Sequence, residues 1–241
     1  MKVIVVNNYE EMSIKAAQIV ASQIILKEES ILGLATGSTP IGMYKELIKL
    51  YEQKIIDFEK TKTFNLDEYF GLSRDNDQSY YYYMRNNLFN HINIKTENTN
   101  IPDGTAKDIH EECINYEEKI KKAGGIDLQV LGIGTNGHIG FNEPDIKFES
   151  TTHLVNLDEE TIKANSRFFD SIDEVPKQAI SMGIKTIMHS KKIVLLANGK
   201  NKADAIYGTV KGNITPELPA SILQLHNDVY IIVDKEAASK L

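Results

Sequence analysis

The sequence predicts an α/β protein built on a single doubly wound, Rossmann-like, mostly parallel sheet with helices on both faces. Two observations support this prediction. Short apolar runs of the kind found in strands buried on both faces recur along the chain. Helical patterns separate most of these runs, as expected for parallel strands joined by crossover helices. No linker, repeat or low-complexity segment interrupts the alternation, so we expect residues 1–241 to form one domain.

The first half of the chain contains three expected strands. Residues 3–6 form the first apolar run, and a helical pattern with a broad apolar stripe follows over residues 10–27. The second run, residues 31–35, precedes apolar residues at helical spacing over residues 43–50. The third run covers residues 63–66.

The second half continues the pattern. An amphipathic helix is expected over residues 108–122, before a buried strand at residues 128–131. Further buried strands are expected at residues 179–182, 193–197 and 229–233. These strands complete the predicted parallel sheet.

Composition limits the possible functions. A chain of 241 residues with 41% hydrophobic content can fill a substantial core. The net charge of −7, with no basic block, argues against nucleic acid or an anionic membrane as the main partner. Cys113 is the only cysteine, which excludes an intrachain disulfide and a multi-cysteine zinc site and suits the cytoplasm. The first apolar run is too short for a signal peptide or a membrane span.

The loop after residues 128–131 has the features of an active site. The apolar run ends in glycines, and His138 and Glu143 follow. Ligands of open α/β sheets bind outside the carboxyl ends of the strands. We therefore expect a histidine and a carboxylate to meet a substrate there.

Gly132, Gly134 and Gly137 also match the pattern G-x-G-x-x-G of dinucleotide-binding proteins. That interpretation needs a helix beginning at the third glycine. Instead, Pro144 follows seven residues later and no helix start is evident. The sequence favours glycines that permit tight turns and close approach of the backbone to a ligand.

Residues 36–40 form a hydroxyl-rich turn between an expected strand and an expected helix. Backbone N–H groups and the dipole at a helix N-terminus favour an anion. The turn has no P-loop lysine, so it is not expected to bind a nucleoside triphosphate. An ordinary helix cap followed by a proline explains the same residues equally well.

Two further stretches have open interpretations. Asp67 and Glu68 follow the strand at residues 63–66, where an acid could act as a base or could simply cap a helix or a solvated turn. The four consecutive tyrosines at residues 80–83 cover every side of a helix. Some of these tyrosines must pack in the core and others must lie at the surface.

Residues 159–173 are polar and helical in pattern, with Arg167 near the middle. They could form a mobile lid, or a surface helix from which Phe168 and Phe169 reach the core. Lys202 lies in a polar stretch that follows residues 193–197, where a single lysine is ordinarily solvated. Lys202 is a candidate site residue only in combination with the other candidates.

Five stretches taken together identify a family. They are Thr-Gly-Ser-Thr-Pro (36–40), Phe-Asn-Leu-Asp-Glu-Tyr (64–69), Gly-His-Ile-Gly-Phe-Asn-Glu-Pro (137–144), Ala-Asn-Ser-Arg-Phe-Phe-Asp (164–170) and Leu-Gln-Leu-His (223–226). In this order and at these intervals they strongly resemble the glucosamine-6-phosphate deaminases, nearly end to end. The resemblance implies conversion of glucosamine 6-phosphate to fructose 6-phosphate and ammonia without a cofactor. It also implies an amino-sugar phosphate as the partner, in amino-sugar catabolism.

The resemblance assigns catalytic roles to four residues. Asp67 matches the residue that moves a proton between C1 and C2 of the opened sugar, giving an enolamine that releases ammonia after tautomerisation. His138 opens the pyranose ring, and Glu143 orients and tunes this histidine. Some members carry an aspartate at the position of Asn136, grouped with the ring-opening histidine. Asparagine lacks that charge but can still hydrogen-bond an imidazole.

The resemblance also assigns the phosphate group of the substrate to a guanidinium fork, a lysine point charge and backbone donors. The residues so assigned are Thr36, Gly37, Ser38, Thr39, Arg167 and Lys202. This favours the anion interpretation of the turn at residues 36–40. No metal ligand is implied.

Three other functions account for parts of the sequence. A 6-phosphogluconolactonase has a similar fold, but we do not expect it to carry the sets at residues 67–69 and 142–144. A sugar-phosphate sensor domain predicts an attached helix-turn-helix, and no basic recognition segment precedes residue 3. A metal hydrolase using His138, Glu143 and His153 would lack the H-E-x-x-H spacing.

The sequence also bears on regulation. Some family members are hexamers that N-acetylglucosamine 6-phosphate activates through a serine, an arginine, a lysine and a tyrosine near the C-terminus. Ile146, His153 and Val155 fall where the serine, arginine and lysine would lie, and the chain ends at Leu241, before the tyrosine. We therefore expect a monomer, or an assembly smaller than the hexamer, that does not respond to this activator.

Overall fold

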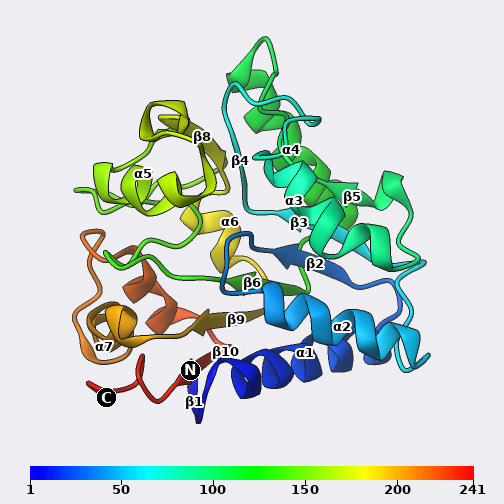
Figure 1. The fold of residues 1–241 in the computed structure, drawn as a ribbon, viewed down its shortest axis with the longest axis horizontal. Helices are drawn as coiled ribbons and strands as arrows, with labels where there is room; N and C mark the ends of the chain where they lie inside the picture. Colours follow the sequence, from blue (N-terminus) through cyan, green and yellow to red (C-terminus); the bar gives the residue numbers. More distant parts are fainter.

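The computed structural model describes residues 1–241, apart from the side chains of residues 160, 164 and 168. A seven-stranded sheet forms the centre (Figure 1), and every neighbouring pair of its strands is parallel. In sheet order the strands are β1 (Lys2–Val6), β10 (Val229–Asp234), β9 (Lys192–Ala197), β6 (Leu128–Leu131), β2 (Ile31–Leu34), β3 (Lys62–Asn65) and β5 (Thr99–Asn100). This confirms the predicted doubly wound fold.

Helices cover both faces of this sheet. They are α1 (Tyr9–Leu26), α2 (Ile41–Glu52), α3 (Tyr80–Asn87), α4 (Ile109–Ala123), α6 (Ile184–Met188) and α7 (Ala203–Lys211), and a further helix, α5 (Glu159–Asn165), lies away from this sheet (Figure 1). Contacts join α1 to α2 and α2 to α3, so these three helices share a face. The connections from β5 to β6, β9 and β10 run back across the sheet. Because crossovers are right-handed, they place α4, α6 and α7 on the opposite face.

Local sequence explains where several helices begin and end. The Asn8 side chain accepts a hydrogen bond from the backbone N–H of Glu11 and caps α1. Asp108 caps α4 in the same way, and this helix ends at Gly124, which has a left-handed φ of 100°. These ends lie within one residue of the boundaries predicted for both helices.

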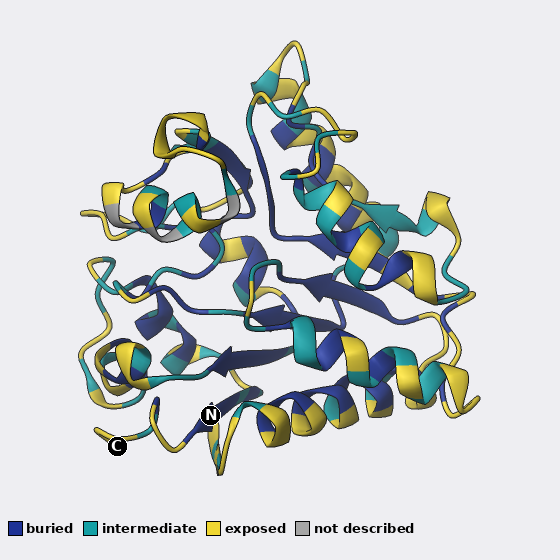
Figure 2. Ribbon diagram, in the orientation of Figure 1, coloured by how far each residue is buried: buried dark blue, intermediate teal, exposed yellow. Residues whose placement is uncertain are grey.

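The core follows the central strands. Every residue of β2 and β6 is buried, as Figure 2 shows for the middle of the sheet. Strand β9 is buried over all but its first residue. Since these strands pack against helices on both faces, they appear in the sequence as continuous apolar runs rather than alternating ones.

A second sheet was not predicted. It has three antiparallel strands in the order β4 (Asp67–Tyr69), β8 (Gln178–Ser181) and β7 (His153–Asn156). The prediction that residues 179–182 extend the parallel sheet was therefore wrong. A short apolar run indicates burial but does not indicate which sheet the strand joins. Here Ala179 packs with Tyr69, Phe141 and Leu157 in a small core separate from the main one.

The tyrosines of α3 divide as predicted. Tyr80 packs against Tyr69, with ring centroids 4.7 Å apart, while Tyr82 is exposed.

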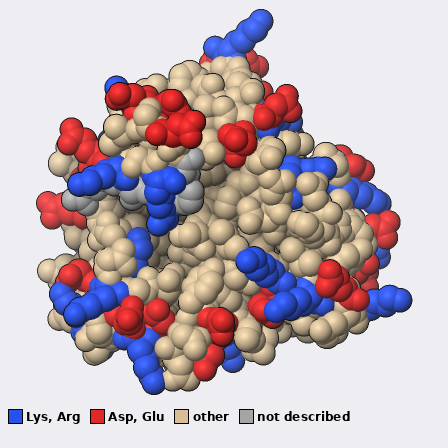
Figure 3. Space-filling view, viewed as in Figure 1, with Lys and Arg blue, Asp and Glu red and all other residues tan. Residues whose placement is uncertain are grey.

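Figure 3 shows basic and acidic side chains interspersed over one face of the molecule. Among the described residues, no helix has both the length and the apolar character needed to cross a membrane.

Candidate active site

Four adjacent strands bring the candidate residues together. In the order β9, β6, β2, β3, their carboxyl ends lead to Lys202, His138, the turn at residues 36–39, and Asp67. The chain leaves β2 toward one face of the sheet and leaves β6 toward the other. Such a divergence opens a crevice at the carboxyl edge of an α/β sheet.

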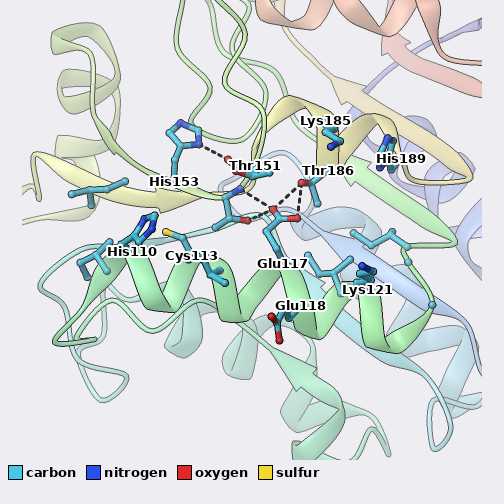
Figure 4. Close-up of a pocket in the computed structure, with 18 residues that line it drawn as sticks. His110, Cys113, Glu117, Glu118, Lys121, Thr151, His153, Lys185, Thr186 and His189 are labelled. Atoms are coloured by element: carbon cyan, nitrogen blue, oxygen red, sulfur yellow. Dashed lines mark hydrogen bonds between the residues drawn. The ribbon is translucent and has the colours of Figure 1, made fainter.

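A cavity of about 450 Å³ occupies this crevice. The predicted residues that line it are Thr36, Gly37, Ser38, Thr39, Asp67, His138, Arg167 and Lys202. Asn136 and Glu143 are not among its lining residues and instead contact His138. A larger hollow of about 1180 Å³ lies between α4, β7 and α6 (Figure 4), and it contains none of the predicted site residues.

Asp67 is buried, with 6% of its surface exposed, and it borders the cavity. Burial raises the pKa of Asp67 to about 8, and the neighbouring Glu68 adds to this rise, while a hydrogen bond from Thr36 opposes it. Its Oδ1 atom has no hydrogen-bond partner among the described residues. A buried carboxylate with an open oxygen and a pKa near neutrality is suited to accept and return a proton.

Glu68 has a different role from its neighbour. Its carboxylate accepts hydrogen bonds from the backbone N–H groups of Tyr69, Tyr80 and Tyr81, at 2.8–2.9 Å. It therefore caps the N-terminus of α3, which is one of the two interpretations left open for this acidic pair. Burial raises the pKa of Glu68 to about 7, although these donors counteract the rise.

His138 and Glu143 form a hydrogen-bonded pair. The Nδ1 atom of His138 lies 3.0 Å from Oε2 of Glu143. Since an ionised carboxylate only accepts, Nδ1 carries a proton and Nε2 keeps its lone pair for a substrate. Burial acts to raise the pKa of Glu143, but hydrogen bonds from His138, Thr161 and Asn136 hold it below its ordinary value.

A glycine makes room for this imidazole. A Cβ atom at Gly134 would lie 2.4 Å from the His138 ring, closer than side chains tolerate. The backbone N–H of Gly134 also donates to the carbonyl of His138 at 2.9 Å. The close approach explains a glycine at this position without a nucleotide.

Among the described residues no hydrogen bond joins Asn136 to the imidazole ring, although the sequence allows one. Its Nδ2 atom donates to Oε2 of Glu143 at 2.8 Å, and its Oδ1 accepts from the backbone N–H of His138 at 3.2 Å. The side chain therefore supports Glu143 as a neutral donor. A carboxylate at this position would need a proton to donate in the same way.

The turn at residues 36–39 lines the cavity with hydroxyl side chains. No described side chain caps α2, whose first flanking residue is Pro40, so the ordinary-cap interpretation of these hydroxyls was wrong. Gly37 has a φ of 87°, which favours glycine. The hydroxyls of Tyr9 and Tyr83 donate to the carbonyls of Ser38 and Gly37, at 3.2 and 2.6 Å, and hold the turn in place.

Two cations, Arg167 and Lys202, line the same cavity as this turn. The guanidinium of Arg167 donates to the Ser38 hydroxyl at 3.2 Å. Burial lowers the pKa of Lys202 to about 8, and the charge of Arg167 lowers it further. Two like charges beside a hydroxyl-lined turn create a site that an anion would neutralise.

Sequence reasoning missed three supporting residues. Thr161 donates its hydroxyl hydrogen bond to Oε1 of Glu143 at 2.6 Å. Tyr80 lines the cavity beside Asp67. Asp234, at the end of β10, accepts from the backbone N–H of Gly199 at 3.0 Å and so holds the segment that carries Lys202. These roles depend on contacts between distant segments, which leave no local pattern.

The segment at residues 159–173 contains α5 and short 3₁₀ turns. Phe169 packs edge-on against Tyr69, with ring centroids 5.9 Å apart, in agreement with the expectation that it reaches the interior. The same expectation for Phe168 falls outside the described side chains. Lid motion of this segment stays a prediction.

The fold and the site together define a class of α/β protein, with a hydroxyl-rich turn, basic side chains and acid–base groups around one cavity at the carboxyl edge of a parallel sheet. The chain belongs to the family of glucosamine-6-phosphate isomerases and 6-phosphogluconolactonases, whose model matches residues 8–231. A glucosamine-6-phosphate deaminase of Clostridium botulinum (strain Hall) is 68% identical over 241 residues, covering 100% of this chain and 99% of its own. The Clostridium acetobutylicum deaminase is 67% identical, with 100% of both chains covered.

Solved structures agree with this assignment. A monomeric glucosamine-6-phosphate deaminase is 50% identical, covers 100% of both chains and has a TM-score of 0.98. A 6-phosphogluconolactonase from Trypanosoma cruzi has a TM-score of 0.78 at 21% identity, covering 100% of this chain and 96% of its own. At that identity the likeness shows a shared fold alone.

Proposed function

We propose that this chain is a glucosamine-6-phosphate deaminase, which converts glucosamine 6-phosphate and water to fructose 6-phosphate and ammonia. The reaction isomerises an aldose to a ketose and hydrolyses a carbon–nitrogen bond, as a cytoplasmic step of amino-sugar catabolism. The observation that carries the proposal is the placement of Asp67 and His138 on one cavity with an anion-binding turn. The deaminases at 67–68% identity over the full chain support it.

Ring opening requires a proton to leave the anomeric hydroxyl and another to reach the ring oxygen. His138 can perform both steps through Nε2, because Glu143 binds its Nδ1–H and fixes the tautomer. The imidazolium formed during the transfer is stabilised by the same carboxylate. The product of this step is the open-chain aldehyde.

Asp67 then carries the isomerisation. Its carboxylate removes the proton from C2 while the aldehyde oxygen at C1 takes up a proton, giving an enolamine. It then returns the proton to C1 as the amino group gives up a proton, giving the imine of fructose 6-phosphate, so that the net change moves one proton from C2 to C1 and one from nitrogen to the C1 oxygen. Water adds to the C2 imine carbon, and ammonia leaves as the ketone forms. The pKa of about 8 keeps Asp67 close to the pH at which it can both accept and donate.

The phosphate anchors the sugar in the same cavity. Arg167, Lys202 and the turn at residues 36–39 supply charges, hydroxyls and backbone donors to one dianion. The phosphate does not react, so these residues contribute mainly to binding. The chemistry assigned to Asp67 and His138 uses no cofactor or metal.

One experiment tests the proposal. Purified protein is incubated with glucosamine 6-phosphate, and ammonia and fructose 6-phosphate are measured together, with the Asp67→Asn variant as the control. Equal amounts of both products are expected from the natural sequence. Absence of both would reject the proposal, and hydrolysis of 6-phosphogluconolactone in a parallel assay would replace it with the lactonase function.

A further inference from the structure

The Glu143 carboxylate has donors from two separate parts of the chain. Its Oε2 atom accepts from Asn136 at 2.8 Å and pairs with His138 at 3.0 Å, both within the same loop. Its Oε1 atom accepts from the hydroxyl of Thr161 at 2.6 Å. The Thr161 donor comes from α5, 18 residues along the chain.

Thr161 is itself buried, with 6% of its surface exposed, and it lines the substrate cavity. The segment that carries it also carries Arg167, which reaches Ser38 in the anion-binding turn. Phe169, two residues further, packs on Tyr69. One placement of this segment therefore brings a cation to the phosphate site and a hydroxyl to Glu143.

We propose that Thr161 is a positioning residue for ring opening, which holds Glu143 in the orientation that His138 needs. This inference rests on the proposed deaminase function and extends it to a residue outside the catalytic loop. With Oε1 held by Thr161, the carboxylate presents Oε2 to Nδ1 of His138. Without Thr161, the two remaining donors share Oε2, and the carboxylate can rotate away from the imidazole.

The charge on Glu143 depends on the same hydroxyl. Burial acts to raise the pKa of Glu143, and Thr161 is one of three hydrogen-bond donors that lower it. Its removal is therefore expected to raise the pKa of this carboxyl. Glu143 also lines a second cavity, of about 350 Å³. Besides His138, the titratable groups near Glu143 are those that line this cavity, namely Asp145, Lys147, Glu149, His153 and Asp158.

Thr161→Val tests the inference, because valine keeps the shape and removes the donor. We expect kcat to fall by about ten- to a hundredfold, the effect of one hydrogen bond to a charged group, with KM little changed. The ratio of variant to natural kcat should fall as the pH is lowered, because Glu143 then protonates more readily; ionisations common to both proteins cancel. Thr161→Ser, which retains the hydroxyl, should restore most of kcat and a flat ratio.

Two controls separate positioning from stability. Thr209→Val makes the same substitution at a buried helical threonine whose hydroxyl bonds the Ala205 carbonyl, and it should leave the pH profile unchanged. In a Glu143→Gln background, Thr161→Val should cost less than about threefold in kcat, since coupled residues are not additive. Thr161→Ala provides a second donor-free variant if the valine protein does not fold.

The outcomes are distinct. If the natural sequence makes neither ammonia nor fructose 6-phosphate, the proposed function fails. If the natural sequence is active but Thr161→Val and Thr161→Ala keep its kcat and its pH profile, the inference about Thr161 is wrong. The same holds if Thr161→Ser is as impaired as Thr161→Val, or if the loss in the Glu143→Gln background is as large as in the natural sequence.

Discussion

At the scale of single residues, Asp67 is expected to affect both the rate of the reaction and the stability of the folded protein. Asp67→Asn is expected to lower kcat by about 10²–10⁴-fold, because an amide cannot accept the C2 proton. KM should change little, since the phosphate site is intact. Initial-rate kinetics of the folded variant measure both constants, and near-normal turnover would contradict the assignment.

The same substitution should affect stability in a pH-dependent way. The pKa of Asp67 in the folded protein is about 8, above its ordinary value of 3.8. Because the folded protein binds this proton more tightly than the unfolded chain, protonated Asp67 contributes to the free energy of unfolding. The contribution is fully present below pH 3.8 and is lost as the pH rises through about 8. Asparagine does not titrate, so the Asp67→Asn variant does not lose this stability as the pH rises. The Tm of the variant minus the Tm of the natural sequence should therefore increase from about pH 5 to about pH 8. Thermal unfolding at several pH values measures this, and a constant difference in Tm would count against it.

The pKa of Lys202 is shifted in the opposite direction to that of Asp67. Burial and the nearby Arg167 lower its pKa to about 8, so its charge is lost as the pH rises past that value. KM for the phosphorylated sugar should therefore rise above about pH 8. Lys202→Gln should raise KM by about ten- to a hundredfold at lower pH and remove this dependence. Lys200→Gln, at an exposed lysine two residues away, is the matched control and should leave KM unchanged.

At the scale of elements, one carboxylate joins α4 to two other parts of the fold. Glu117 accepts from the backbone N–H and the hydroxyl of Thr152, at 2.7 and 2.6 Å, and from the Thr186 hydroxyl at 2.8 Å (Figure 4). Thr152 immediately precedes β7, and Thr186 lies in α6. These bonds attach the small sheet to α4 and α6.

Glu117→Ala is therefore expected to lower the free energy of unfolding by about 1–3 kcal/mol, the cost of leaving such donors unsatisfied. Denaturant unfolding measures the change. Glu118→Ala is the matched control, because Glu118 pairs only with Lys122 on the surface among the described residues. Equal effects of the two substitutions would show that Glu117 does not join these elements.

At the scale of the whole molecule, we propose a monomer without allosteric activation. The 50% identical structure is of a monomeric deaminase. Ile146 is 91% exposed, and neither Ile146 nor Val155 can bind a phosphate. An effector shifts an equilibrium only by binding two states unequally, so a missing anion site removes its effect.

The rate is accordingly expected to depend hyperbolically on substrate and not to respond to N-acetylglucosamine 6-phosphate. Light scattering coupled to gel filtration should give the mass of one chain, 27.1 kDa. Sigmoidal rates that become hyperbolic on adding this sugar phosphate would overturn the proposal. So would a hexameric mass.

The sequence alone predicted six of the seven strands of the parallel sheet and the helices α1, α2 and α4, but it did not predict β4, β5, β7, α6 or α7. Apolar runs such as residues 31–35 and 128–131 predict buried strands because burial on both faces requires continuous apolar side chains. Asp108 and Gly124 mark the ends of α4 because capping depends on neighbouring residues alone. The loop after residues 128–131 indicated His138 and Glu143 as candidates, and the resemblance of five stretches to a family assigned the catalytic roles.

The tertiary structure decided how these residues act. The strand order brings Lys202, His138 and Asp67 to one cavity, and it places β8 in a second sheet that its apolar run does not reveal. Glu68 caps α3 while Asp67 faces the cavity, although the two are adjacent in the chain. Desolvation and hydrogen bonds between distant segments set these roles, and both depend on packing that no local pattern encodes.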